Sequence, residues 1–192
     1  MFAAAAAVAG MFFATPSAAS GPDEFVRITG KQAFSSLGGE ISNVERARRF
    51  RKILTQSFDF PTIAKFVLGR YWRIANKKQR GEYVVLFEDF IVQAYAHRFK
   101  DLSGKEFIVK QSRKLTARDM LVLSEVVIAP GKPPIRVNWR VRGPNNQYRV
   151  IDVVVEGISM SVTQRDEFAA VIRSSGGKVE GLLAALRKKT SN

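Results

Sequence analysis

The sequence has no cysteine and only one histidine, His97. Without thiols the chain can form no disulfide and offers no thiolate to a metal ion. A single imidazole does not supply the usual set of zinc ligands either. We therefore expect no metal site and no cofactor, and a fold whose stability comes from packing.

Long hydrophobic runs are also missing outside Phe2–Ala14. That run is shorter than the roughly 20 residues that cross a bilayer, and Pro16 and the small residues Ser17–Ser20 follow it. This pattern predicts a secretory signal peptide over residues 1–20. No Lys or Arg precedes the run, so a disordered alanine-rich tail is the alternative. Residues 21–192 are then expected to form one domain, because about 170 residues suit a single core.

Acidic side chains are scarce: 17 Asp and Glu stand against 31 Lys and Arg, which gives a formal net charge of +14. Residues 1–20 carry no charged side chain, so residues 21–192 carry all of this charge. Basic side chains gather in Arg46–Lys52 and Arg187–Lys189, both within expected helices. Such faces can simply be solvated, or they can meet an anionic membrane surface, an acidic protein or nucleic acid. An export signal argues against nucleic acid.

The first half of the chain has helical patterns. Pro22–Leu37 and Asn43–Phe58 are expected helices separated by glycines, with Asn43 as the cap of the second. Asp59 is placed to cap a short helix that ends at Gly69. The pair of Asn76 and Gln79, spaced as a capping box, predicts the start of a long helix whose apolar residues occupy most of its circumference. Such a helix has to be covered on more than one side.

After Gly104 the hydrophobic period changes to two. Strands are expected around Phe107 and Val109 and over Met120–Ile128, Ile135–Val141 and Tyr148–Val155. Short connections rich in Pro, Gly and Asn make them antiparallel neighbours. Closing helices are expected over Ser161–Ser174 and Lys178–Lys189. The predicted fold class is α+β, with a curved antiparallel sheet of about four strands covered by helices on one face.

Two ordered blocks of sequence resemble the MlaC, or toluene-tolerance, family. The first is FDFPTIAKFVLGRYWRIANKKQR, residues 58–80, and the second is RVIDVVVEGISMSVTQRDEF, residues 149–168. In the second block Asp152, Glu156, Gly157, Ser159 and Arg165 fit the family pattern, whereas Gln164 stands where a tyrosine is usual. The resemblance runs from about Glu24 to Leu186.

The resemblance implies a cystatin-like or NTF2-like sheet and a periplasmic lipid carrier without catalytic residues. It implies phospholipid, or a hopanoid-type lipid, as cargo. It also implies an inner-membrane ABC transporter complex and an outer-membrane lipoprotein complex as partners of a monomer.

Apolar stripes at strand and helix spacing are ordinary core when taken alone. The resemblance instead favours a lipid cavity between them. The lipid-binding residues predicted in this way are Phe66, Val67, Trp72, Tyr83, Phe87, Phe90, Ile91, Tyr95, Val137, Trp139, Val141, Val150, Val154 and Ile158.

Two other functions compete with the carrier. One is a basic extracytoplasmic binding module for an acidic protein or polysaccharide, without lipid cargo. The other is a secreted esterase with Ser159, His97 and Asp152 as its triad. The second is disfavoured, because Ser161 stands where a nucleophile elbow needs glycine. We expect Asp152, Glu156 and Arg165 to form a structural charge cluster at a strand end.

Overall fold

The structure of the chain is a computed structural model that describes residues 21–143 and 147–191. The predicted signal peptide therefore lies outside the described residues. The first half is helical and comprises α1 (Pro22–Leu37), α2 (Asn43–Ser57), α3 (Phe60–Leu68), α4 (Tyr71–Ile74), α5 (Lys77–Tyr95) and the 3-10 helix η1 (Ala96–Leu102). The second half comprises β1 (Glu106–Lys114), β2 (Asp119–Val127), β3 (Ile135–Arg142), β4 (Arg149–Val155), β5 (Ile158–Ser159), α6 (Met160–Ser174) and α7 (Val179–Thr190).

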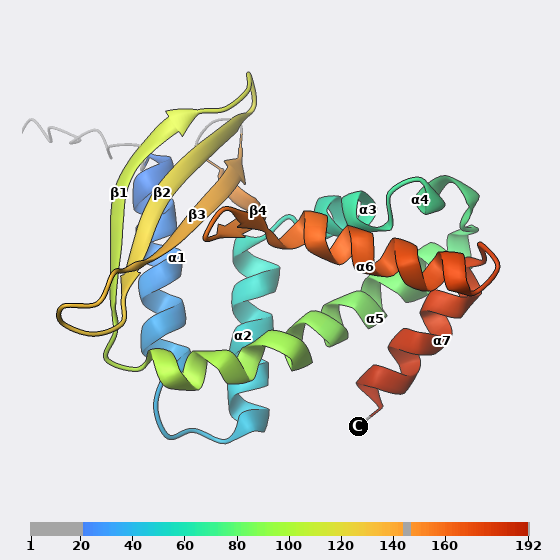
Figure 1. The fold of residues 1–192 in the computed structure, drawn as a ribbon, viewed down its shortest axis with the longest axis horizontal. Helices are drawn as coiled ribbons and strands as arrows, with labels where there is room; N and C mark the ends of the chain where they lie inside the picture. Colours follow the sequence, from blue (N-terminus) through green and yellow to red (C-terminus); the bar gives the residue numbers. More distant parts are fainter. Residues whose placement is uncertain (1–20, 144–146, 192) are drawn as a thin grey trace, which may run out of the picture.

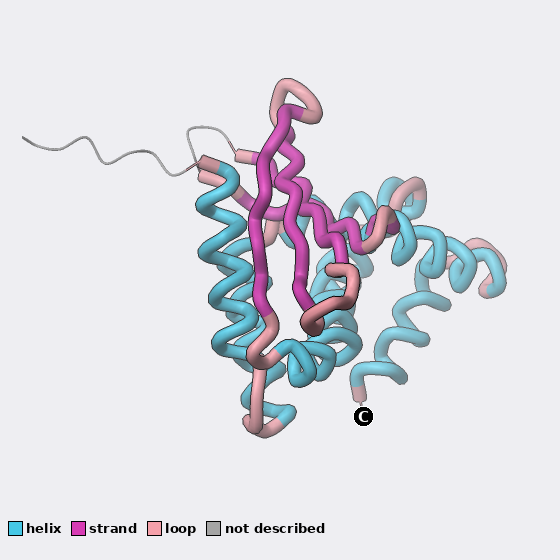
Figure 2. The backbone as a smooth tube through the Cα atoms, turned by 60° about the vertical axis from the view of Figure 1, so that its left-hand side comes forward, coloured by secondary structure: helices cyan, strands magenta, loops and turns pink. Residues whose placement is uncertain are grey.

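The strands form one antiparallel sheet in the order β1-β2-β3-β4-β5. Four of them are long and β5 has two residues, which confirms the predicted α+β fold with a meander of about four strands. The ladder is irregular between Val109 and Gln111 and again between Arg140 and Val141. Such bulges bend and twist a sheet. Helix α1 contacts β1 and β2 and lies along one face of the sheet (Figures 1 and 2).

Helix α5 connects the two halves of the molecule (Figure 1). Its first half carries Tyr83 and Phe87, which are buried in a core shared with α3, α6 and α7. Its last turns carry Val92, which is buried in a second core with α1 and α2. A third core lies under the sheet, where Val26 of α1 meets strand residues. These contacts confirm the prediction that α5 is covered on more than one side.

Most of the predicted helix boundaries hold because their caps form. The side chain of Asp59 accepts from the backbone N–H of Thr62 at 3.1 Å, and Asn76 and Gln79 form a reciprocal capping box. Asn43 was the wrong cap for α2: the hydroxyl of Ser42 accepts from the N–H of Glu45 at 3.1 Å. A cap residue must have extended backbone angles, and Ser42 has them.

Gly69 ends α3 with φ +58° and ψ −129°, a conformation that only glycine adopts readily. The chain then turns at once into the short helix α4, which the sequence patterns did not predict. A side chain at this position would also press on the guanidinium of Arg165, 3.0 Å from where a Cβ would stand. The turn at Gly69 therefore sets the direction of α4 relative to α3.

Candidate functional site

A cavity of about 660 Å³ lies between the inner face of the sheet and the helices. Sites that enclose small ligands have volumes of roughly 300–1,000 Å³. Its lining is predominantly apolar and comes from both halves of the chain: Gly30, Ala33, Phe34, Phe50, Leu54, Phe58, Phe60, Ile63, Val67, Phe87, Ile91, Tyr95, Arg98, Phe99, Leu102, Phe107, Val126, Ile135, Val137, Trp139, Asp152, Val153, Val155, Glu156, Ile158, Met160, Ser161 and Gln164.

Aromatic rings form a continuous part of this wall. The ring centroids of Phe34 and Phe107 are 5.5 Å apart, and Phe107 meets Trp139 edge to face at 6.0 Å. The ring centroid of Phe58 lies 6.4 Å from that of Trp139. Rings at these separations attract one another. The wall is thus held together from α1 across β1 and β3 to the segment before α3.

Several polar side chains in the wall already have hydrogen-bond partners. Asp152 is 4% exposed and accepts hydrogen bonds from the hydroxyls of Ser159 and Ser161, each at 2.6 Å, and from the backbone N–H of Ser161 at 3.1 Å. The amide nitrogen of Gln164 donates to the carboxylate of Glu167 at 3.0 Å. Because these groups already have partners, they fix the start of α6 against the sheet and leave the cavity surface apolar.

One end of the lining reaches the surface. Ile158 is 58% exposed and Ile135 is 37% exposed. Beside them the carboxylate of Glu156 accepts from the backbone N–H and the guanidinium of Arg136, and these bonds lower the pKa of Glu156. Arg98 is exposed, with its guanidinium carbon 5.1 Å from the centroid of the Tyr95 ring. The lining thus combines an apolar interior with charged groups where it meets solvent.

The structure brings half of the predicted lipid-binding set to this cavity. The residues in its wall are Val67, Phe87, Ile91, Tyr95, Val137, Trp139 and Ile158. The others lie elsewhere: Phe66, Trp72, Tyr83, Phe90, Val141, Val150 and Val154. Their contacts explain the difference.

On α5, Tyr83 and Phe90 face the core of α6 and α7, where both pack near Phe168. Phe66 and Trp72 lie at the outer end of the molecule. The guanidinium of Arg165 covers the ring of Phe66, and that of Arg80 covers the indole of Trp72.

On the sheet, Val141 and Val150 are fully buried in the close-packed cluster with Val26. Val154 was expected to share a face with Val150, but the irregularity between Arg140 and Val141 shifts the register. One extra residue in a strand turns every following side chain to the opposite face. Val153 and Val155 therefore line the cavity in place of Val154.

The sequence patterns also missed wall residues on α1 and η1, such as Phe34 and Phe99. A moderately apolar helix pattern indicates that these helices bury a face, but it does not say which partner that face meets. Arg98 was missed for the same reason.

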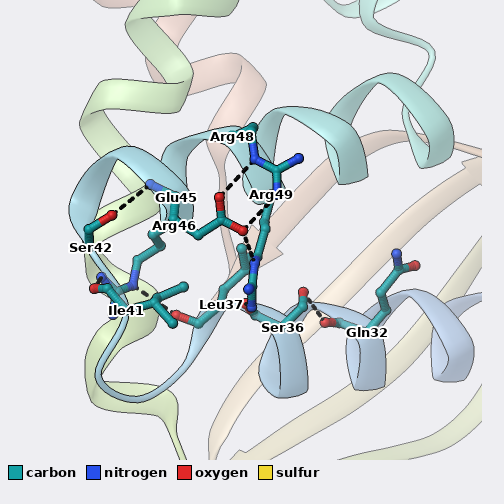
Figure 3. A network of polar contacts seen from close by, with 9 residues as sticks. All are labelled: Gln32, Ser36, Leu37, Ile41, Ser42, Glu45, Arg46, Arg48 and Arg49. Atoms are coloured by element: carbon teal, nitrogen blue, oxygen red, sulfur yellow. Dashed lines mark hydrogen bonds and ion pairs between the residues drawn. The ribbon is translucent and has the colours of Figure 1, made fainter.

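The basic stretch of α2 is largely engaged inside the molecule (Figure 3). Arg46 is 1% exposed and donates to the backbone carbonyls of Leu37 at 2.8 Å and Ile41 at 3.1 Å. Arg48 and Arg49 bind the carboxylate of Glu45, and their hydrogen bonds lower the pKa of Glu45 to about 2.

Arg51 completes the pattern, because it binds Glu88 at 2.7 Å and Asp89 at 2.6 Å on α5. Arg46, Arg49 and Arg51 therefore stabilise the first helices, whereas Lys52 is exposed and Arg48 keeps most of its side chain in solvent. The net charge of +14, which also motivated the basic binding module, is unaffected by these internal contacts.

Of the hypothetical triad, Ser159 and Asp152 are hydrogen-bonded to each other, but His97 bonds to neither of them. His97 is exposed on η1, and its Nδ1 is 3.4 Å from the carbonyl of Gln93. The Ser159 hydroxyl contacts Asp152, Ser161 and the N–H of Val162 at the start of α6. Asp152, Glu156 and Arg165 do not form the single cluster that was predicted: Asp152 accepts from Ser159 and Ser161, Glu156 binds Arg136, and the guanidinium of Arg165 covers the ring of Phe66.

Two further properties concern the residues that the structure describes. Among them there is no group of His, Asp and Glu side chains that could hold a metal ion. None of their helices is long and apolar enough to cross a membrane.

Comparisons with known proteins agree with this architecture. A family model described as "MlaC protein" matches residues 32–188. The intermembrane phospholipid transport system binding protein MlaC of Haemophilus influenzae is 19% identical over 185 residues, which are 92% of this chain and 86% of that protein. A phospholipid-binding protein from Ralstonia solanacearum, solved in complex with a phospholipid, is similar with a TM-score of 0.75 and 22% identity. That match covers 90% of this chain and 98% of the other, and it establishes the fold.

Proposed function

The chain belongs to the MlaC family, and from this we propose that it carries phospholipid between membranes with acyl chains enclosed in the cavity beneath the sheet. The similar protein from Ralstonia solanacearum was solved with a phospholipid, and the relative from Haemophilus influenzae is a binding protein of intermembrane phospholipid transport. The observation that carries the proposal is the cavity itself: about 660 Å³ walled almost wholly by apolar side chains.

Binding would be driven by removal of acyl chains from water. Each buried methylene contributes about 0.8 kcal/mol, so a long chain is held firmly. The wall needs no polar recognition of the chain, because Asp152 and Ser161 already satisfy each other. An apolar wall of this kind selects for chain volume and tolerates differences in unsaturation. Hopanoid-type lipid is the alternative cargo of the same cavity.

The polar head group would stay at the exposed end of the cavity. Ile158 and Ile135 lead outward there, and Arg98 and Glu156 provide charges in the lining. A guanidinium binds phosphate oxygens in two-point geometry. We assign Arg98 to the phosphate of the bound lipid on this basis.

A carrier of this kind would act in the periplasm. We propose that it exchanges lipid with an inner-membrane ABC transporter complex and an outer-membrane lipoprotein complex, and that it does so as a monomer of one domain, residues 21–192, without catalysing a reaction. Because chain burial is strongly favourable, release requires a partner that opens the wall.

Transfer between liposomes tests this function. Donor liposomes carry a labelled phospholipid, acceptor liposomes carry none, and delipidated protein is added. We expect the transfer rate to rise in proportion to protein concentration, with label recovered on the protein. As a control, the variant Phe66→Ser changes a residue outside the cavity and should transfer lipid at the normal rate. Transfer no faster than without protein would contradict the proposal, and ester hydrolysis by the protein would revive the esterase.

A further inference from the structure

A second, shallower pocket lies away from the sheet, where α4 approaches the turn between α6 and α7 (Figure 1). Its volume is about 460 Å³, and its lining is Arg70, Tyr71, Arg73, Ile74, Arg173 and Gly177. It shares no residue with the lining of the lipid cavity. The sequence patterns did not single it out.

Three arginines, Arg70, Arg73 and Arg173, line this pocket, and no acidic residue does. Several arginines elsewhere do have an acidic partner, as Arg51 has in Glu88 of α5. Within residues 21–143 and 147–191, the ion pairs include none with Arg70, Arg73 or Arg173. Cations brought together without a counterion repel one another, so an anion would stabilise this arrangement.

Neighbouring contacts hold the pocket in shape. Arg70 donates to the hydroxyl of Tyr71 at 2.9 Å, and Tyr71 is only 6% exposed. Arg80 at the start of α5 donates to the backbone carbonyl of Trp72 at 2.9 Å, and this bond ties α4 to α5. On the opposite wall Gly177, with φ +78°, donates its N–H to the carbonyl of Ile172 at 2.9 Å.

The same pocket exposes an apolar side chain among its cations. Ile74, the last residue of α4, is 65% exposed and lines the pocket together with the three arginines. A soluble phosphate gains nothing from such a neighbour. Cations that surround an exposed aliphatic side chain are typical of surfaces that sit at the boundary between head groups and acyl chains.

We propose that this pocket binds the phosphate groups of anionic phospholipids at a membrane surface, with Ile74 in contact with the outermost acyl carbons. Arginine suits this role because its planar fork binds phosphate oxygens at two points and is weakly hydrated. The residues of this pocket are different from those at the exposed end of the lipid cavity. The proposal does not depend on what the cavity carries.

Vesicle sedimentation at physiological salt tests the site. The full chain is mixed with vesicles of phosphatidylcholine alone or with phosphatidylglycerol added. We expect binding only to the second kind, and a loss of about a hundredfold in the variant Arg70→Gln/Arg73→Gln/Arg173→Gln, the effect of removing three basic groups from an anionic surface. Ile74→Ser, which keeps the charge, should also weaken binding.

The matched control removes the same charge at the turn between β1 and β2. Arg113, Lys114 and Arg118 are exposed there. The variant Arg113→Gln/Lys114→Gln/Arg118→Gln should bind the vesicles nearly as wild type does, and circular dichroism should show all variants folded. Equal losses in both triple variants would overturn the site, since net charge alone would explain binding. Wild-type binding that millimolar glycerol phosphate abolishes, with no effect of Ile74→Ser, would overturn the membrane as its ligand.

Discussion

The indole N–H of Trp139 on β3 donates a hydrogen bond to the hydroxyl of Ser124 on β2, 3.0 Å away. That hydroxyl in turn donates to the backbone carbonyl of Val137. The one polar atom of the indole is thereby turned toward the sheet and satisfied. Its ring is left to pack against Phe58 and Phe107 and to line the cavity.

Ser124→Ala removes this partner and leaves the indole N–H buried without an acceptor. We expect a loss of about 1–3 kcal/mol in the free energy of unfolding, the usual cost of an unsatisfied buried donor. Urea unfolding of delipidated protein measures it. Ser35→Ala, at an exposed position of α1, is the control and should stay within about 0.5 kcal/mol of wild type. Equal stabilities of the two variants would contradict this role of Ser124.

Val137 and Val141 share one face of β3, but only Val137 lines the cavity, whereas Val141 is fully buried. Val137→Trp should therefore fill space that an acyl chain would occupy. We expect bound lipid to fall severalfold while the unfolding midpoint of delipidated protein stays close to wild type. Organic extraction with mass spectrometry gives the lipid content.

The matched change Val141→Trp has no space to enter. Overpacking a core usually costs about 1–3 kcal/mol, so this variant should be destabilised while the folded fraction keeps its lipid. If Val137→Trp lost stability and kept lipid, the cavity would be a close-packed core at this strand, and the assignment of its wall would be wrong.

The sequence predicted the parts of this fold that local chemistry decides. Asp59, Asn76 and Gln79 cap their helices as expected, and the change of hydrophobic period after Gly104 marks the start of the sheet. These signals work because a cap or an alternation needs only a few neighbouring residues.

Features that depend on distant segments could not be predicted in the same way. The irregularity near Val141 is a mismatch between two strands, so nothing in β4 alone shows that Val153 replaces Val154 in the wall. The helix pattern around Arg46 could not show that its guanidinium caps the end of α1. Tyr83 and Ile91 both lie on apolar parts of α5, yet only the packing of α6 and α7 decides that Tyr83 is core.

The stability of the protein should depend on pH through Asp119, which pairs with Arg142 between β2 and β3. Asp119 is buried and accepts two bonds from Arg142, at 2.6 Å and 3.2 Å, and these lower its pKa in the folded chain. A lowered folded-state pKa contributes stability that is present above the unfolded value, about 3.9, and is lost as the pH falls toward the folded value.

Thermal unfolding of wild type and Asp119→Asn between pH 7 and pH 3 measures this contribution. We expect the variant to be less stable at pH 7, with a gap that holds to about pH 5 and narrows below about pH 4. A gap that stays constant down to pH 3 would show that the ion pair does not couple folding to this proton.

Native mass spectrometry of the purified protein tests the central claim most directly. If the cavity carries phospholipid, the folded protein should appear with an added mass of one phospholipid, and collisional activation should release that lipid for identification. Val137→Trp, purified in parallel, should appear mainly without it. A wild-type protein that is free of lipid, and that takes up none when its delipidated form is mixed with phospholipid liposomes, would contradict the account.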